Sequence, residues 1–154
     1  MELPVRKHTR IPNYNYASHN YYFVTVCTHH KKCIFGQPNS LNQYGIIAKR
    51  FLLDIERYYP QVIIDQCVVM PNHIHAIIII GTDEKERQLP NLTRVIGQYK
   101  MAVSKEIHKE DPELTFWQRS FHDHIIRNQG SYEKIWMYIE NNPQKWEEDC
   151  FYCK

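Results

Sequence analysis

One stretch in the middle of the chain limits the possible folds more than any other. The segments Val62–Val69 and Ile74–Ile80 are rich in Val and Ile, and Pro71-Asn72 lies between them. β-Branched residues favour strands, and a Pro-Asn pair is typical of a turn. The longest apolar run, Ala76–Ile80, is far shorter than the ~20 residues that a membrane helix needs. We therefore predict two strands separated by a turn, and no membrane segment.

Further elements are expected on both sides of these strands. Aromatic and β-branched residues predict two more strands, at Tyr21–Thr28 and Phe121–Arg127. Apolar residues at helical spacing predict helices at Leu41–Tyr59 and Leu92–His108.

A last helix is expected to take Ser131 as its N-cap and to end at Pro143, because proline cannot continue a helix. The order is then strand, helix, strand, strand, helix, strand and a C-terminal helix, which is the split βαβ arrangement. We predict an α+β fold: a ferredoxin-like (RRM-like) antiparallel sheet with helices on one face and the other face free to carry a site. A chain of 154 residues has the size of one core, so residues 1–154 are expected to form a single domain.

Composition narrows the class of protein. With 43% hydrophobic and 23% charged residues, the chain is neither disordered nor fibrous. The first ten residues, MELPVRKHTR, lack the apolar region of a secretory signal, so we expect a cytoplasmic protein. The net charge of +2 is uneven, with +6 over residues 1–53 and −4 over residues 54–154. A basic half suits a polyanion bound on one face.

The five cysteines do not predict a disulfide framework, because their number is odd and no signal peptide precedes them. Cys150 and Cys153 have the spacing of half a zinc site, but no second pair matches them. Two histidines near Cys27 and Cys33 fit no standard zinc module. We therefore expect reduced, partly buried thiols.

A His-x-His pair is the strongest chemical signal. His73 and His75 in VVMPNHIHAIIII are two residues apart in a predicted strand, so both side chains lie on one face. Two imidazoles there can bind one divalent metal; alternatively, they are two histidines on a wet face of the sheet. His122 and His124 form a rival pair with the same spacing. The first pair is preferred because it follows a tight turn and opens an apolar strand, which provides a rigid platform.

A tyrosine and an asparagine share one face of the last helix. Tyr138 and Asn142 are four residues apart, and Asn142 precedes Pro143, which places the pair at the last turn. Asn141 is one residue out of register. The alternative is a packing tyrosine followed by an Asn-Pro helix stop.

Together the two segments suggest phosphate chemistry. A metal held by His73, His75 and an amide oxygen keeps open positions for phosphate oxygens and acts as a Lewis acid. A tyrosine on an adjoining helix can attack that phosphate and form a phosphotyrosine. Phosphate oxygens favour Mg²⁺ or Mn²⁺, although two imidazoles favour softer metals.

The sequence resembles the HUH single-tyrosine transposases, most closely the REP-associated tyrosine transposases and their insertion-sequence relatives. The resemblance runs in order from Arg10 to Asp149, through RIPNYNY, YYFVTVCTHHKKCIFG, VVMPNHIHAIIII, FWQRSFHDHIIRN and YIENNPQKWEED. It implies that Tyr138 is the nucleophile and that His73, His75 and Asn142 are the metal ligands. In the insertion-sequence relatives a glutamine usually fills the place of Asn142.

The resemblance also implies a substrate and a product. The expected partner is single-stranded DNA with a hairpin, of the kind found at REP elements or insertion-sequence ends. Cleavage near the hairpin would leave a 5′-phosphotyrosine and a free 3′-OH that can later rejoin strands. The tyrosine helix is swapped between subunits of a dimer in the insertion-sequence enzymes, whereas a monomer acting in cis fits the REP-associated branch, so both a homodimer and a monomer are open.

Basic residues are expected to hold the DNA. The N-terminal arm can contact phosphates through Arg6, Lys7 and Arg10. Family positions that tend to be basic match Lys100, Arg119 and Arg127, which either bind phosphate or pair with Asp123 or Glu106. Beside the arm, two tyrosines can stack on bases or pack in the fold: Tyr14 and Tyr16.

Two other functions fit parts of this pattern. An RRM-like domain that binds single-stranded nucleic acid without cutting it would also use aromatic strands and a basic arm. A zinc-dependent hydrolase would want a third histidine or an acid. Neither requires a tyrosine one helical turn before Asn142, so Tyr138 favours the transposase.

Overall fold

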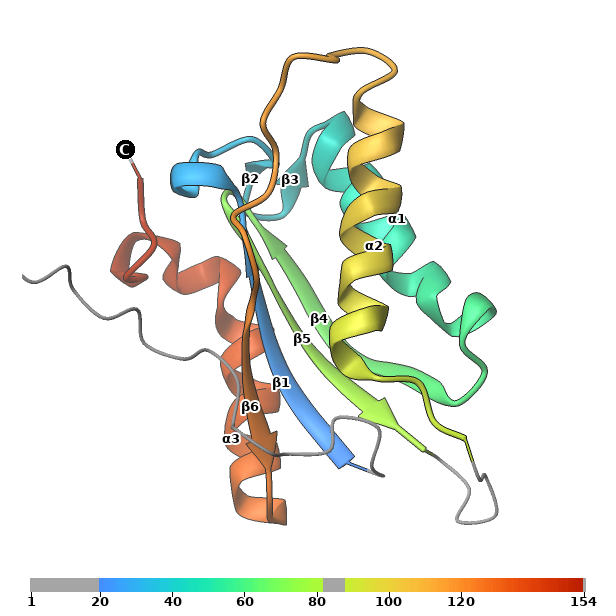
Figure 1. Ribbon diagram of the computed structural model, residues 1–154. Coiled ribbons are helices and arrows are strands. Elements are labelled where there is room, and N and C mark those ends of the chain that lie inside the picture. Colours follow the sequence, from blue (N-terminus) through green and yellow to red (C-terminus); the bar gives the residue numbers. More distant parts are fainter. Residues whose placement is uncertain (1–19, 82–87, 154) are drawn as a thin grey trace, which may run out of the picture.

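The computed structural model describes residues 20–81 and 88–153. Its main sheet has four antiparallel strands in the order β4–β5–β1–β6 (Figure 1). Their bounds are β1 Asn20–Cys27, β4 Val62–Met70, β5 His73–Ile80 and β6 His122–Ile126. The four predicted strands are confirmed, with ends that differ by at most one residue. A small second sheet joins β2 (Gly36–Gln37) to β3 (Ser40–Leu41), after the short 3-10 helix η1 (His29–Lys31).

Two helices cover one face of the main sheet, α1 (Gln43–Tyr58) and α2 (Leu92–Ile107) (Figure 1). The backbone N–H groups at the start of α1 would lack partners, and Asn42 caps them by accepting hydrogen bonds from two of them. The apolar residues of both helices pack on Val24, Val26 and Ile74 in the larger core. Strand β5 therefore contributes alternate residues to this core.

The C-terminal helix α3 (Gln129–Asn141) lies on the opposite side of the sheet and is followed by the 3-10 helix η2 (Pro143–Glu148) (Figure 1). Ile139 of α3 packs on Ile77 in a second, smaller core. The face left open by α1 and α2 is not bare, because α3 has its own apolar residues to bury there. Ser131 is also not the N-cap: the side chain of Asn128 accepts the hydrogen bond from the Ser131 backbone N–H.

The chain after η2 turns back toward the loop that follows β1. Cys153 forms a disulfide with Cys33, with 6.9 Å between their Cα atoms. The prediction that all thiols are reduced is wrong for this pair, because two cysteines 120 residues apart in sequence are brought together by the fold. Cys27, Cys67 and Cys150 are free, as expected. Within residues 20–81 and 88–153, no helix has both the length and the apolar character to cross a bilayer.

Candidate active site

The His-x-His pair begins β5, a central strand of the main sheet. His73 is paired with Met70 and Cys27, and His75 with Val68 and Thr25, so both imidazoles lie on the face that α3 covers. Their exposed fractions are 0% and 3%. The alternative of two histidines on a wet face is therefore wrong.

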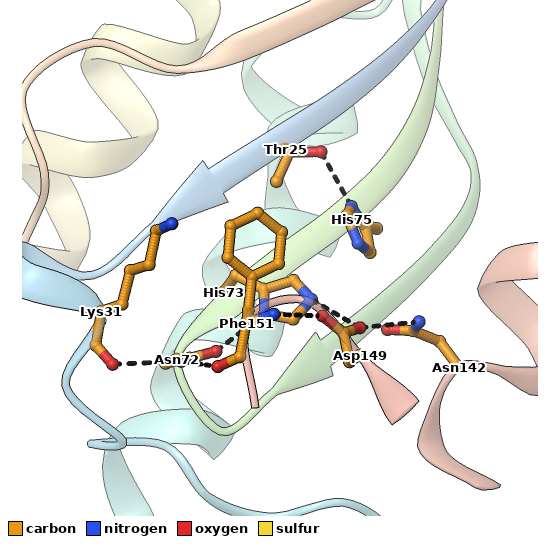
Figure 2. A network of polar contacts seen from close by, with 8 residues as sticks. All are labelled: Thr25, Lys31, Asn72, His73, His75, Asn142, Asp149 and Phe151. Carbon is orange, nitrogen blue, oxygen red and sulfur yellow. Dashed lines mark hydrogen bonds and ion pairs between the residues drawn. The ribbon is translucent and has the colours of Figure 1, made fainter. Parts of the chain in front are cut away.

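Aromatic side chains bury the pair. The ring of Phe151 lies 4.7 Å from that of His73, and the ring of Tyr138 lies 5.4 Å from that of His75, measured between centroids. Figure 2 shows the ring of Phe151 in front of His73, with Asp149 beside them. The site is thus built from β5, α3 and the residues that follow η2.

Hydrogen bonds fix the orientation of His73. The amide nitrogen of Asn72 donates to the carbonyl oxygens of Lys31 (3.0 Å) and Phe151 (2.7 Å), so its Oδ1 faces the Nδ1 of His73 at 2.8 Å (Figure 2). An amide oxygen only accepts, so Nδ1 of His73 carries the hydrogen and Nε2 carries a lone pair. Nδ1 of His75 is likewise held, 2.8 Å from the hydroxyl of Thr25.

Helix α3 brings the predicted tyrosine and asparagine to the same place. Asn142, the C-cap of α3, is buried and donates from Nδ2 to Oδ2 of Asp149 at 3.2 Å. Tyr138, one turn earlier, is 45% exposed and contacts the rings of Phe23 and His75. A cavity of about 390 Å³ opens beside these residues, with Tyr138, Asn142 and Asp149 in its wall.

Three buried polar atoms meet here without partners. Within the described part of the chain, no hydrogen bond reaches Nε2 of His73, Nε2 of His75 or Oδ1 of Asn142. Such orphaned buried polar atoms are costly unless something else binds them. No three His, Cys, Asp or Glu side chains among residues 20–81 and 88–153 group as a metal cage. Two imidazole nitrogens with one amide oxygen are nevertheless a donor set that fits a divalent cation.

Burial keeps both imidazoles neutral. It lowers the pKa of His73 to about 4, although the Asp149 carboxylate partly offsets the shift. Burial, and then the neighbouring His73, lower the pKa of His75 well below its usual value. The pKa of Tyr138 is raised, first by burial and then by Asp149, so the phenol keeps its proton near neutral pH. The histidines are thus ready to donate lone pairs.

The metal-free protein should lose stability as the pH falls from about 6.5 to about 4. In this window the unfolded state binds a proton at His73 and the folded state does not, so the free energy of unfolding falls as pH falls. The loss from His73 alone is about 3 kcal/mol. Urea unfolding in EDTA at several pH values measures it. A variant with His73→Gln and His75→Gln should lose less; parallel curves for the two proteins would contradict the assignment.

The other candidate residues lie apart from this centre. His122 and His124 pair with Thr25 and Phe23, which puts them on the same face as His73, but both are exposed on the edge strand β6. Nζ of Lys100 donates to the carbonyl oxygens of Gln118 and Ser120 at 2.7 and 2.9 Å.

The remaining predicted DNA contacts divide into two groups. Arg119 and Arg127 are exposed on either side of β6. Glu106, a suggested partner for such residues, pairs with Lys109 at 2.6 Å. Five predicted contacts lie outside the described residues: Arg6, Lys7, Arg10, Tyr14 and Tyr16.

Sequence reasoning missed three residues of the site. Asn72 was assigned only to the turn, although it directly precedes His73 and fixes it. Asp149 and Phe151 follow η2. Their spacing in the sequence does not indicate a role in the site, because the path of the chain after Pro143 decides where they lie.

Comparison with known proteins identifies the family. A family model described as "Transposase IS200 like" matches residues 15–142. The chain belongs to the IS200-like transposase family. The resemblance noted in the sequence is thereby confirmed, and the match ends at Asn142, the last of the four residues that meet in the site.

Other known proteins are similar to this chain. The IS200-like transposase is 36% identical to an uncharacterized protein of Haemophilus influenzae, over 96% of this chain and 93% of the relative. It is also similar to a REP-associated tyrosine transposase solved bound to a REP hairpin. That match has a TM-score of 0.68 and 20% identity, and it covers 92% of this chain and 74% of the other.

A second solved structure shares the fold. A candidate transposase of Deinococcus radiodurans matches with a TM-score of 0.54 and 16% identity, over 86% of this chain and 97% of the other. At these identities the two structures show that the IS200-like transposase has the α+β fold predicted from its sequence.

Proposed function

We propose that this transposase, as one domain over residues 1–154, cuts single-stranded DNA beside a hairpin and later rejoins strands. The observation that carries the proposal is the meeting of three unpartnered buried polar atoms, on His73, His75 and Asn142, with a partly exposed tyrosine. A protein that only bound DNA would gain nothing from burying two imidazoles without partners for their Nε2 atoms.

The residues that would hold a divalent metal, Mg²⁺ or Mn²⁺, are His73, His75 and Asn142. When bound, the metal would supply Lewis-acid polarisation of the phosphate oxygens. The hydrogen bonds from Asn72 and Thr25 keep the two imidazoles in place before DNA arrives. Such preorganisation reduces the reorganisation needed in the reaction.

Tyr138 is the proposed nucleophile. Its phenolic oxygen attacks the phosphorus, the new P–O bond to tyrosine forms, and the bond from phosphorus to the 3′ oxygen breaks. The products are a 5′-phosphotyrosine and a strand that ends in a 3′-OH, which takes up the proton that the phenol has lost. The phosphodiester energy is kept, so a 3′-OH can attack the phosphotyrosine and rejoin strands.

The DNA itself is proposed to follow the basic residues. The similar REP-associated enzyme was solved with a hairpin, and the same class of ligand is proposed here. The arm of Arg6, Lys7 and Arg10 would contact phosphates, as would Lys100, Arg119 and Arg127. The proposal covers both a monomer that cuts in cis and a homodimer, because in either case the Tyr138 helix packs on the strand that carries His73 and His75.

A covalent protein–DNA adduct is the decisive test. We expect adduct when the full chain is incubated with labelled single-stranded hairpin oligonucleotides from its own genomic flanks and Mn²⁺ or Mg²⁺, and none in EDTA. Gel electrophoresis in denaturant detects the adduct, and mass spectrometry of the DNA-linked peptide should locate the bond at Tyr138. Tight binding without adduct under either metal would contradict the proposal and favour a non-catalytic, RRM-like binding domain.

A further inference from the structure

Asp149 is a buried acid beside the proposed metal ligands that the mechanism has not used. Its side chain is 2% exposed. Oδ1 accepts from the backbone N–H of Phe151 at 2.8 Å, and Oδ2 accepts from Nδ2 of Asn142 at 3.2 Å. Oδ2 also lies 3.8 Å from Nε2 of His73 (Figure 2). The carboxylate is thus fixed by the amide of Asn142 and the backbone of Phe151, and it lies beside the imidazole of His73.

The amide of Asn142 can be placed in two ways. Its oxygen and nitrogen have nearly the same shape, so a rotation of 180° about the last side-chain bond would exchange them. The exchanged amide would turn its NH₂ group toward the imidazole of His73, whose Nε2 carries a lone pair. In the metal-free site that arrangement is favourable locally, and it would remove the oxygen ligand.

We propose that Asp149 is a positioning residue that holds the amide of Asn142 with its oxygen toward His73 and His75. A carboxylate only accepts hydrogen bonds, so it binds the NH₂ group of Asn142 and would repel its oxygen. The inference rests on the proposed function, since it concerns the orientation of a metal ligand. Asp149 acts through Asn142 and does not itself need to touch metal or DNA.

The same short segment holds a second ligand in place. The carbonyl oxygen of Phe151 accepts from Asn72, whose own oxygen orients the imidazole of His73. The disulfide between Cys33 and Cys153 ties the segment to the loop after β1. The segment Asp149–Phe151 therefore sets the hydrogen-bonding direction of two of the three proposed ligands.

Titration of Mn²⁺ into the full chain, followed by electron paramagnetic resonance of the free ion, tests the inference without DNA cleavage. Asp149→Asn should bind Mn²⁺ about 10- to 100-fold more weakly than the wild type, the usual effect of losing a partner that orients a ligand. Glu148→Gln is the matched control, because it removes an equal charge from the wall of the same cavity, and it should bind like the wild type. Thermal unfolding in EDTA should show that both variants are folded.

The same substitution made in an Asn142→Asp variant shows whether Asp149 orients residue 142 or contacts the metal directly. The two oxygens of a carboxylate are equivalent, so the side chain introduced by Asn142→Asp presents an oxygen to the metal in either orientation. Asp149→Asn should then cause no further loss of Mn²⁺ affinity. An equal loss in both backgrounds would mean that Asp149 acts on the metal directly, and the inference would be overturned.

The remaining outcomes are also decisive. Equal binding by wild type and Asp149→Asn would overturn the inference and leave the proposed function intact. Tighter binding or faster cleavage by Asp149→Asn would overturn it too, because the segment would then obstruct the site. If the wild type itself binds no Mn²⁺ at His73 and His75, the metal site of the proposed function fails, and this inference fails with it.

Discussion

Tyr138→Phe is expected to lower the rate of adduct formation by at least about 1,000-fold, because it removes the phenolic oxygen that forms the covalent bond to phosphorus. Tyr138 is 45% exposed, so loss of its hydroxyl should leave the fold intact. Binding of the hairpin and of Mn²⁺ should also persist. A time course of adduct formation, with fluorescence anisotropy for binding, measures both effects.

Tyr132→Phe is the matched control for this substitution. Tyr132 lies on the same helix, but its hydroxyl bonds to Asp65 and not to the site. The Asp65 carboxylate raises the pKa of Tyr132 to about 12, which makes it a poor substitute nucleophile. If Tyr138→Phe kept the wild-type rate, or Tyr132→Phe lost it, the nucleophile would be assigned to the wrong residue.

Substitution of both His73 and His75 should abolish the stabilisation of the fold by a divalent metal. At a Mn²⁺ concentration 100 times its Kd, the wild type should be stabilised by about 2.7 kcal/mol, which raises the Tm by roughly 5–11 °C for a chain of this size. The double variant His73→Ala with His75→Ala should show no such shift and no adduct. Thermal unfolding with Mn²⁺ and with EDTA measures the difference.

The rival histidine pair supplies the control for that experiment. His122→Ala with His124→Ala removes the same His-x-His spacing from an exposed strand on the same face. This variant should retain the shift in Tm. A shift lost only in the His122 and His124 variant would place the metal on β6 and would contradict the candidate site.

Local patterns predict most of this fold, because they act over a few residues. The hairpin of β4 and β5 follows from β-branched segments around Pro71-Asn72, and α3 ends where proline interrupts its hydrogen bonds. Tyr138 and Asn142 come together because helical spacing sets their direction, whatever the helix packs against. The N-cap of α3 was misplaced because Asn128 and Ser131 are both good caps, and their order of use depends on the approach of the chain from β6.

Contacts between segments that are distant in the sequence cannot be predicted from such local patterns. Asp149 reaches the site only because the chain reverses direction after η2, and the disulfide of Cys33 depends on the same reversal. The burial of His73 likewise depends on Phe151, which lies 78 positions later in the sequence. A periodic pattern can assign a side chain to a face of a sheet, but it does not show what will cover that face.

The position of β5 in the sheet makes the length of the turn before it a strict constraint. This strand is hydrogen-bonded on both sides, to β4 and to β1, and successive side chains alternate between the two faces. Insertion or deletion of one residue in the turn would move every side chain to the other face: Ile74 would enter the site, and both imidazoles would enter the apolar core. A change in the length of the turn therefore removes both nitrogen ligands in a single step.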